Sequence, residues 1–177
     1  MNQSEINYVK NLVRNVPDFP VKGVQFKDLT PVFKDPKAIC MMRDALVEIY
    51  RGKGITKVLG IESRGFICAP MLAAEIGAGF VPVRKPGKLP ADTCSITYMK
   101  EYGEDSIEIH SDAIEPGDVV LIHDDLLASG GTMRAACELV ARLKPARVMV
   151  SFLCAIPELK GLEALPPDVD VSVLFNF

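Results

Sequence analysis

Two N-terminal stretches carry an apolar side chain about every three to four residues, the spacing that places them on one face of a helix. The first predicted helix covers residues 4 to 14 and is opened by Ser4, and the prolines that follow prevent its continuation. The second has Asp35 as its N-cap and Pro36 in its first turn, and it ends near Gly52. The two apolar stripes consist of Ile6, Val9 and Val13, and of Ile39, Met42, Leu46 and Ile49.

Past the second helix, short apolar runs alternate with helical stretches. Such alternation is typical of an α/β fold in which a central, mostly parallel sheet is flanked by helices. Ligands bind these sheets beyond the carboxyl ends of the strands, so we expect the chemistry just after residues 61, 83 and 124. The predicted strands are 57 to 61, 79 to 83, 118 to 124, 146 to 156 and a last one near 169 to 174, and the helices between them are 65 to 76 and 131 to 143.

Two other stretches show no clear period. The segment FPVKGVQFKDLTP (19 to 31) is predicted to form a loop. Residues 84 to 104 hold charges, prolines and glycines with weak alternation from Ser95 to Met99, which suits a long excursion or lid better than core. Because the sequence shows no internal repeat and no linker, we expect a single domain over residues 1 to 177.

Composition limits the classes of function. The 177 residues are 49% hydrophobic, enough to bury one sizeable core, and a formal net charge of -3 provides no positive field to hold nucleic acid or an anionic membrane. The N-terminus lacks a basic segment followed by an apolar core, and no apolar run reaches membrane-spanning length, so the expected location is cytoplasmic. The five scattered cysteines form no Cys-x-x-Cys pair, and we expect them to be reduced and mostly buried.

The segment VVLIHDDLLASGGTM (119 to 133) carries the strongest chemical signal, because it joins a buried strand, two acids, a turn of small residues and a helix. Small residues let backbone N–H groups approach an anion, and the helix start adds its positive end, which suits a phosphate monoester. Asp124 and Asp125 point to opposite faces of the strand, so they suit ribose hydroxyls better than a shared metal ion. Alternatively, the acids begin a turn and the small residues merely cap a helix. The small-residue turn and helix start comprise Ala128, Ser129, Gly130, Gly131 and Thr132.

This segment resembles the signature of the type I phosphoribosyltransferases that binds phosphoribosyl pyrophosphate (PRPP). Three further segments resemble the adenine branch of that family, and together the matches cover nearly the whole chain. They are FPVKGVQFKDLTP (19 to 31), GIESRGF (60 to 66) and RKPGKLP (84 to 90). The resemblance implies the type I phosphoribosyltransferase fold, with residues 91 to 107 as a flexible hood and residues 1 to 31 contributing to the base pocket.

The resemblance also implies an activity: transfer of the phosphoribosyl group of PRPP to adenine, giving AMP and pyrophosphate in purine salvage. Mg2+ would come with PRPP, no metal ligand is expected from the protein itself, and a homodimer is expected. Two alternatives remain open. One is an enzyme for another base, such as xanthine or hypoxanthine, and the other is a non-catalytic PRPP-sensing regulator of the same fold. A nucleic-acid-binding regulator would need a basic face, which the charge of -3 disfavours.

The resemblance assigns the remaining site residues by position. Arg64, with Ser63, would bind pyrophosphate and supply the first cation, and Glu101 is the candidate proton carrier. A cluster of exposed cations or a lone exposed Glu is ordinarily only solvated, so the motif match alone distinguishes them. The other cations for pyrophosphate are Arg84, Lys85 and Lys88, and Tyr102 would close with Glu101 over the reactants.

In the implied base pocket, Phe26 and Leu126 sandwich the purine while backbone groups of the loop that contains Val24 and Lys27 read its edge. Both apolar residues are also compatible with ordinary core positions. Where hypoxanthine-guanine relatives carry an aspartate that exchanges a proton with the purine, this chain has Ala128, which favours adenine. Three departures from the family pattern are Ser129, Lys27 and His123, the last of which is interpreted as a satisfied strand histidine.

Overall fold

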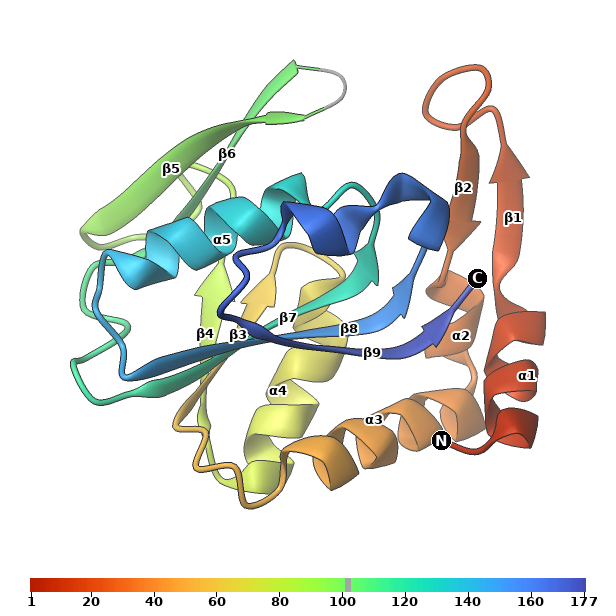
Figure 1. Ribbon diagram of the computed structural model, residues 1–177, viewed down its shortest axis with the longest axis horizontal. Helices are drawn as coiled ribbons and strands as arrows, with labels where there is room; N and C mark the ends of the chain where they lie inside the picture. Colours follow the sequence, from red (N-terminus) through yellow and green to blue (C-terminus); the bar gives the residue numbers. More distant parts are fainter. Residues whose placement is uncertain (101–102) are drawn as a thin grey trace.

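A five-stranded parallel sheet forms the centre of the computed structural model, which describes residues 1 to 100 and 103 to 177 (Figure 1). The strand order is β4-β3-β7-β8-β9, and each neighbouring pair runs parallel. Both the predicted strands and their parallel arrangement are therefore confirmed. The strands are β3 (Lys57–Ile61), β4 (Gly79–Val83), β7 (Val119–Leu127), β8 (Arg147–Ala155) and β9 (Asp170–Asn176).

Apolar cores cover both faces of the sheet, which explains why its strands are continuous apolar runs. Leu121 and Ile122 are neighbours in β7 and belong to opposite cores, because successive strand residues point to opposite faces. α3 and α4 pack with α1 and α2 on one face, and α5 packs with a hairpin on the other (Figure 1). The helices are α1 (Gln3–Leu12), α2 (Thr30–Lys34), α3 (Pro36–Tyr50), α4 (Gly65–Ile76) and α5 (Gly131–Ala141).

Of the two N-caps predicted from the sequence, one is confirmed and one is wrong. The predicted N-cap Asp35 is confirmed, since its Oδ1 accepts the Ala38 N–H at 2.8 Å. The predicted opening of the first helix at Ser4 is wrong by two residues. Asn2 is the N-cap: its side chain accepts the Glu5 N–H, and the Glu5 carboxylate accepts the Asn2 N–H in return.

The stretch predicted as a loop, residues 19 to 31, contains β2 (Gln25–Asp28), which forms an antiparallel hairpin with the preceding β1 (Arg14–Pro17). Both strands have only four residues, and most of their side chains are polar, so the sequence offers no run of alternating apolar positions. The hairpin extends beyond the sheet on the side where β8 ends (Figure 1). It therefore stands beside the carboxyl ends of the strands, where ligands are expected.

The predicted excursion is largely a second antiparallel hairpin, β5 (Thr93–Lys100) with β6 (Gly103–His110). Its inner face belongs to the core above α5, because Ile96, Tyr98 and Ile107 are each at most 8% exposed. The weak alternation from Ser95 to Met99 was therefore the signal of a strand. Glu101, the expected proton carrier, and Tyr102, expected to close with it over the reactants, lie outside the described residues.

Two short 3-10 turns, η1 (Pro157–Leu159) and η2 (Gly161–Ala164), follow β8 and were not predicted. They connect the end of β8 to the last strand and pack beside the start of α5 (Figure 1). Among the described residues, no helix is both long enough and apolar enough to cross a bilayer.

One buried polar side chain lies in the middle of the sheet. His123 of β7 is 0% exposed, and its Nδ1 lies 3.2 Å from the Ser151 hydroxyl on β8. Its Nε2 has no hydrogen-bond partner among the described residues, so the histidine is satisfied on one side of the ring only. Burial disfavours the charged imidazolium and lowers the pKa of His123 to about 4.

This burial predicts a pH dependence of stability. The unfolded chain takes up a proton on His123 below its ordinary pKa of 6.5, whereas the folded chain does so only near pH 4. The free energy of unfolding is therefore highest, as far as His123 determines it, above pH 6.5, and it declines as the pH falls toward 4. Between pH 7 and pH 5, His123 is expected to lower the free energy of unfolding by about 2 kcal/mol.

We expect His123→Val to remove that part of the pH dependence. Urea unfolding of both proteins at pH 7, 6 and 5 measures it, and the difference between the two curves isolates His123 because the other groups titrate in both. Parallel curves would contradict the prediction.

Candidate active site

The loops that follow β3, β4 and β7 meet at one edge of the sheet, as the strand ends predicted. Two adjoining cavities lie there, of about 350 and 390 Å3, and Asp124 and Thr132 line both. We call the first the phosphate-loop cavity, because the loop Ala128–Gly130 lines it, and the second the strand-end cavity.

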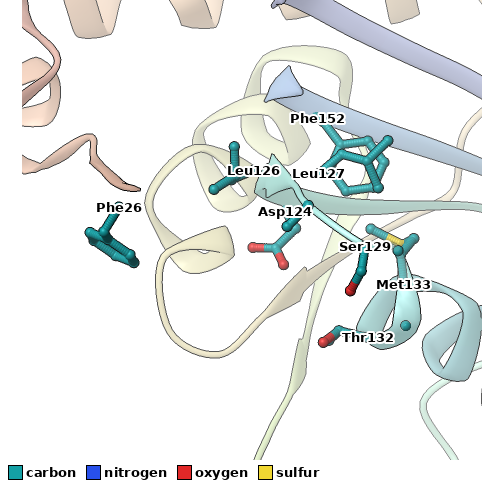
Figure 2. Close-up of a pocket in the computed structure, with 11 residues that line it drawn as sticks. Phe26, Asp124, Leu126, Leu127, Ser129, Thr132, Met133 and Phe152 are labelled. Carbon is teal, nitrogen blue, oxygen red and sulfur yellow. The ribbon is translucent and has the colours of Figure 1, made fainter. Parts of the chain in front are cut away.

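The loop Ala128–Gly130, which we call the phosphate loop, has the backbone features of an anion-binding site. Gly130 is the N-cap of α5 with φ 82°, a left-handed conformation that glycine adopts without strain, and no side chain caps the helix. The first N–H groups of α5 are therefore available to a ligand, together with the positive end of the helix. Figure 2 shows the hydroxyls of Ser129 and Thr132 on the same open side as the Asp124 carboxylate. The structure thus brings the predicted phosphate-binding residues together.

The two acids face different surroundings, as predicted for neighbouring strand residues. The expectation that both hold the ribose fits Asp124 alone, because Asp125 lines neither cavity. Asp124 points into the cavities, whereas Asp125 is 2% exposed and its Oδ2 lies 2.7 Å from the Arg64 Nε. The Asp125 N–H donates to the Asp124 Oδ1 at 2.9 Å. Burial and the charge of Asp125 raise the pKa of Asp124 well above its ordinary value. Burial also raises the pKa of Asp125, against the opposing effect of Arg64.

Arg64 links three parts of the site. It precedes α4, lines the strand-end cavity with Ser63 and Lys85, and forms the ion pair with Asp125. Its guanidinium carbon also lies 5.3 Å from the centre of the Phe26 ring on β2. The predicted pyrophosphate residue is therefore at the centre of the site and already paired within the protein.

Two of the other predicted cations, Arg84 and Lys85, are held by carboxylates that the sequence interpretation missed. Glu62 accepts hydrogen bonds from the Arg84 Nε at 3.1 Å and from the Lys85 N–H at 3.0 Å. These bonds lower the pKa of Glu62. Arg84 also donates to the Lys88 carbonyl oxygen at 3.2 Å, so the loop from 84 to 88 is folded back on itself. Glu62 stands inside the GIESRGF segment and could have been found there.

Two further acids on the β5–β6 hairpin hold the same loop. Glu108 is 7% exposed, and its Oε1 accepts the Gly87 N–H at 3.0 Å. Asp105 forms an ion pair with the Lys85 ammonium at 2.5 Å. Neither acid stands out in the sequence, because the contact joins residues about twenty positions apart, and no local pattern signals it.

The base side of the phosphate-loop cavity contains some of the predicted residues. Phe26 and Leu126 both line it, from β2 and β7. Val24 lies in the turn before β2 and is not among the lining residues. Lys27 points elsewhere: its Nζ donates to the Asn15 side chain at 2.7 Å. The sequence interpretation missed the apolar residues that complete the lining, which are Leu127, Met133 and Phe152.

The cysteines and possible metal ligands do not form a second centre. All five cysteines are free, and burial raises the pKa of Cys68 and Cys137 to about 12, which makes these thiols inert at neutral pH. In the described part of the chain, no three His, Cys, Asp or Glu side chains come together as a metal site.

Comparison with known proteins agrees with this geometry. Residues 32–176 match the phosphoribosyl transferase domain family. The chain is 54% identical to the adenine phosphoribosyltransferase of Bacteroides fragilis, over 91% of this chain and 90% of that protein.

Two solved structures are also similar over nearly their whole length. The adenine phosphoribosyltransferase of Rhodothermus marinus gives a TM-score of 0.93 at 48% identity, covering 99% of this chain and 100% of that one. The Giardia lamblia enzyme, solved with 9-deazaadenine, gives 0.93 at 39% identity and covers 97% of each chain. The chain therefore belongs to the phosphoribosyltransferase family, in the branch of the adenine phosphoribosyltransferases.

Proposed function

We propose that this protein transfers the phosphoribosyl group of PRPP to adenine and releases AMP and pyrophosphate. One observation carries the proposal: the uncapped start of α5 and the cations after β3 and β4 flank the same carboxylate, Asp124. This spacing suits a sugar with a phosphate at one end and a pyrophosphate at the other. The 54% identity to a bacterial adenine phosphoribosyltransferase supports the same activity.

In the proposed reaction, purine N9 attacks ribose C1 as the bond from C1 to the pyrophosphate oxygen breaks. The electron pair of that bond leaves with pyrophosphate, and the N9 proton passes to Glu101, the proposed proton carrier, as AMP forms. The 5'-phosphate lies on the N–H groups of the phosphate loop, and the ribose hydroxyls donate to Asp124. Arg64 and Lys85, with the Ser63 hydroxyl, receive the leaving pyrophosphate, and Mg2+ enters as part of the PRPP substrate.

The ion pairs that these cations form in the free protein support this role. Lys85 is paired with Asp105 and Arg84 with Glu62, so the protein holds these cations in place before substrate binds. Pyrophosphate carries more negative charge than either carboxylate and competes for the same donors. Glu101 remains the proposed proton carrier, with Tyr102 beside it.

We propose that adenine stacks between Phe26 and Leu126 and pairs its amino group with backbone carbonyls near Val24. An amino group donates, so a backbone carbonyl satisfies it without a side-chain partner. The complex of the Giardia enzyme with 9-deazaadenine supports a site of this kind. We also propose a cytoplasmic homodimer, in which Arg84 reaches toward the neighbouring subunit's site.

The base preference is directly testable. Incubated separately with PRPP, Mg2+ and each common nucleobase, the protein is expected to form AMP with adenine and little nucleotide with hypoxanthine, guanine or xanthine. A site built for one polar edge leaves its own groups unpaired with another, and discrimination reaches about four orders of magnitude. Chromatography of the products measures it. Efficient use of another base with adenine inert would reject adenine, and no nucleotide with any base would favour a regulator.

Asp124→Asn tests the ribose contact. We expect kcat/KM for PRPP to fall by about ten- to a thousandfold, because a hydrogen bond to a charged acceptor is lost in the transition state. Asp112→Asn, at an exposed acid in the turn after β6, is the control and should leave the value unchanged. Unchanged kinetics in Asp124→Asn would remove this acid from the site.

The proposed hood makes a prediction about protection. Tyr98 of β5 already donates to the Thr132 hydroxyl at the start of α5, at 3.1 Å. We expect PRPP with adenine to slow amide exchange and proteolysis over residues 91 to 107, because a closed hood excludes water from the activated sugar. β8, in the middle of the sheet, is the internal reference. Equal exchange with and without ligands would contradict closure.

A further inference from the structure

The back of the phosphate loop rests against the turn η2, about thirty residues further along the chain (Figure 1). A Cβ added to Gly161 would lie 2.1 Å from the Ala128 carbonyl oxygen. From the opposite side, a Cβ added to Gly130 would lie 2.4 Å from the Gly161 carbonyl oxygen. Neither distance is compatible with a side chain, so two glycines bring the two backbones into direct contact.

The two glycines are required for different reasons. Gly130 has a left-handed conformation, so its φ of 82° alone favours glycine. Gly161 is not among the residues with positive φ, and its backbone conformation is one that other residues adopt. What excludes a side chain at Gly161 is the close approach of Ala128 and of Leu127, whose Cδ1 would lie 2.8 Å away. Gly161 is also buried.

This contact lies on the side of the loop that faces away from the ligand. A loop that binds phosphate through N–H groups must turn its carbonyl oxygens elsewhere. The Leu127 carbonyl accepts the Ile156 N–H at 3.0 Å, the Ala128 carbonyl faces Gly161, and the Gly130 carbonyl accepts the Arg134 N–H at 2.9 Å. Two of these three contacts come from the segment that follows β8.

We infer that Gly161 is a positioning residue for the phosphate loop. Its lack of a side chain lets η2 pack against Ala128 and Gly130 and hold the loop with its N–H groups toward the 5'-phosphate. The inference rests on the proposed function for the identity of that ligand. It predicts that a change at Gly161 weakens phosphate binding more than it weakens adenine binding or slows the chemical step.

The test compares Gly161→Ala with Gly79→Ala. Gly79 also has ordinary φ, but a Cβ there meets the Lys57 side chain at 3.5 Å and the Thr56 carbonyl oxygen at 3.7 Å, which are ordinary contacts. Calorimetry with ribose 5-phosphate probes the loop without base or pyrophosphate. For Gly161→Ala we expect Kd for ribose 5-phosphate and KM for PRPP to rise about tenfold or more, with KM for adenine within about twofold of wild type. Gly79→Ala should change none of them.

A purely structural role would lower Tm and the active fraction, and therefore apparent kcat, while leaving Kd and KM unchanged. That result, or an equal loss of affinity for adenine and ribose 5-phosphate, would overturn the inference. If Gly161→Ala does not fold, Ala164→Gly replaces it. The Ala164 Cβ lies 3.0 Å from where a Gly130 Cβ would be, so this variant removes support from the loop and adds no atom.

For Ala164→Gly we expect a smaller rise of about two- to fivefold in the same Kd and KM, and unchanged values would overturn the inference as well. Failure of the proposed function has a different signature. Wild type and Gly79→Ala would then form no AMP, while binding of ribose 5-phosphate would still report on the loop.

Discussion

The ion pair between Arg64 and the buried Asp125 holds the carboxyl ends of β3 and β7 together, and the rest of the site is arranged around it. The backbones approach closely at the same place: a Cβ on Gly65 would lie 2.8 Å from the His123 carbonyl oxygen. Because a buried carboxylate without its partner is costly, this pair fixes the start of α4 against β7. Asp124 precedes Asp125 in β7 and therefore points the other way, into the two cavities. Arg64 lines the strand-end cavity together with it.

The site gathers cations in a chain whose formal net charge is -3. Acidic partners within the protein make this possible, since Glu62 and Asp105 hold Arg84 and Lys85 next to the strand-end cavity. Held in this way, the cations do not repel one another strongly in the free protein. In the reaction we propose, pyrophosphate replaces the carboxylates as their partner, and positioning is then the main source of rate.

The sequence predicted those features that local patterns encode. The apolar runs predicted the five strands of the sheet, and the order of strand, acids and small residues predicted where Asp124 and the phosphate loop lie. Features set by distant contacts were not predictable. The cap at Asn2 and the cap expected at Ser4 are both chemically reasonable, and only the reciprocal bond with Glu5 decides between them. The roles assigned to Glu101 and Tyr102 stay predictions.

The base side shows the same limit more sharply. Neighbouring residues of a strand face opposite ways, so once β2 turns Phe26 to the cavity, Lys27 must turn toward Asn15. The family match placed both residues in one loop and carried no information on which face each side chain takes. Likewise, the contact between Gly161 and Ala128 joins parts of the chain whose proximity depends on how β8 pairs with β7. No local motif contains that information.

The lining of the phosphate-loop cavity supports the proposed preference for adenine. Among its described lining residues, the only polar side chains are Asp124, Ser129 and Thr132, which are the residues proposed to bind sugar and phosphate. The described lining residues include no lysine that could donate to an oxygen at C6 of a purine. Reading of the base edge is thereby left to backbone groups, whose carbonyls accept from an amino group. In the binding mode we propose, the oxygen of a 6-oxopurine would face backbone carbonyls and have no donor, and an unpaired buried polar group costs about 1–3 kcal/mol.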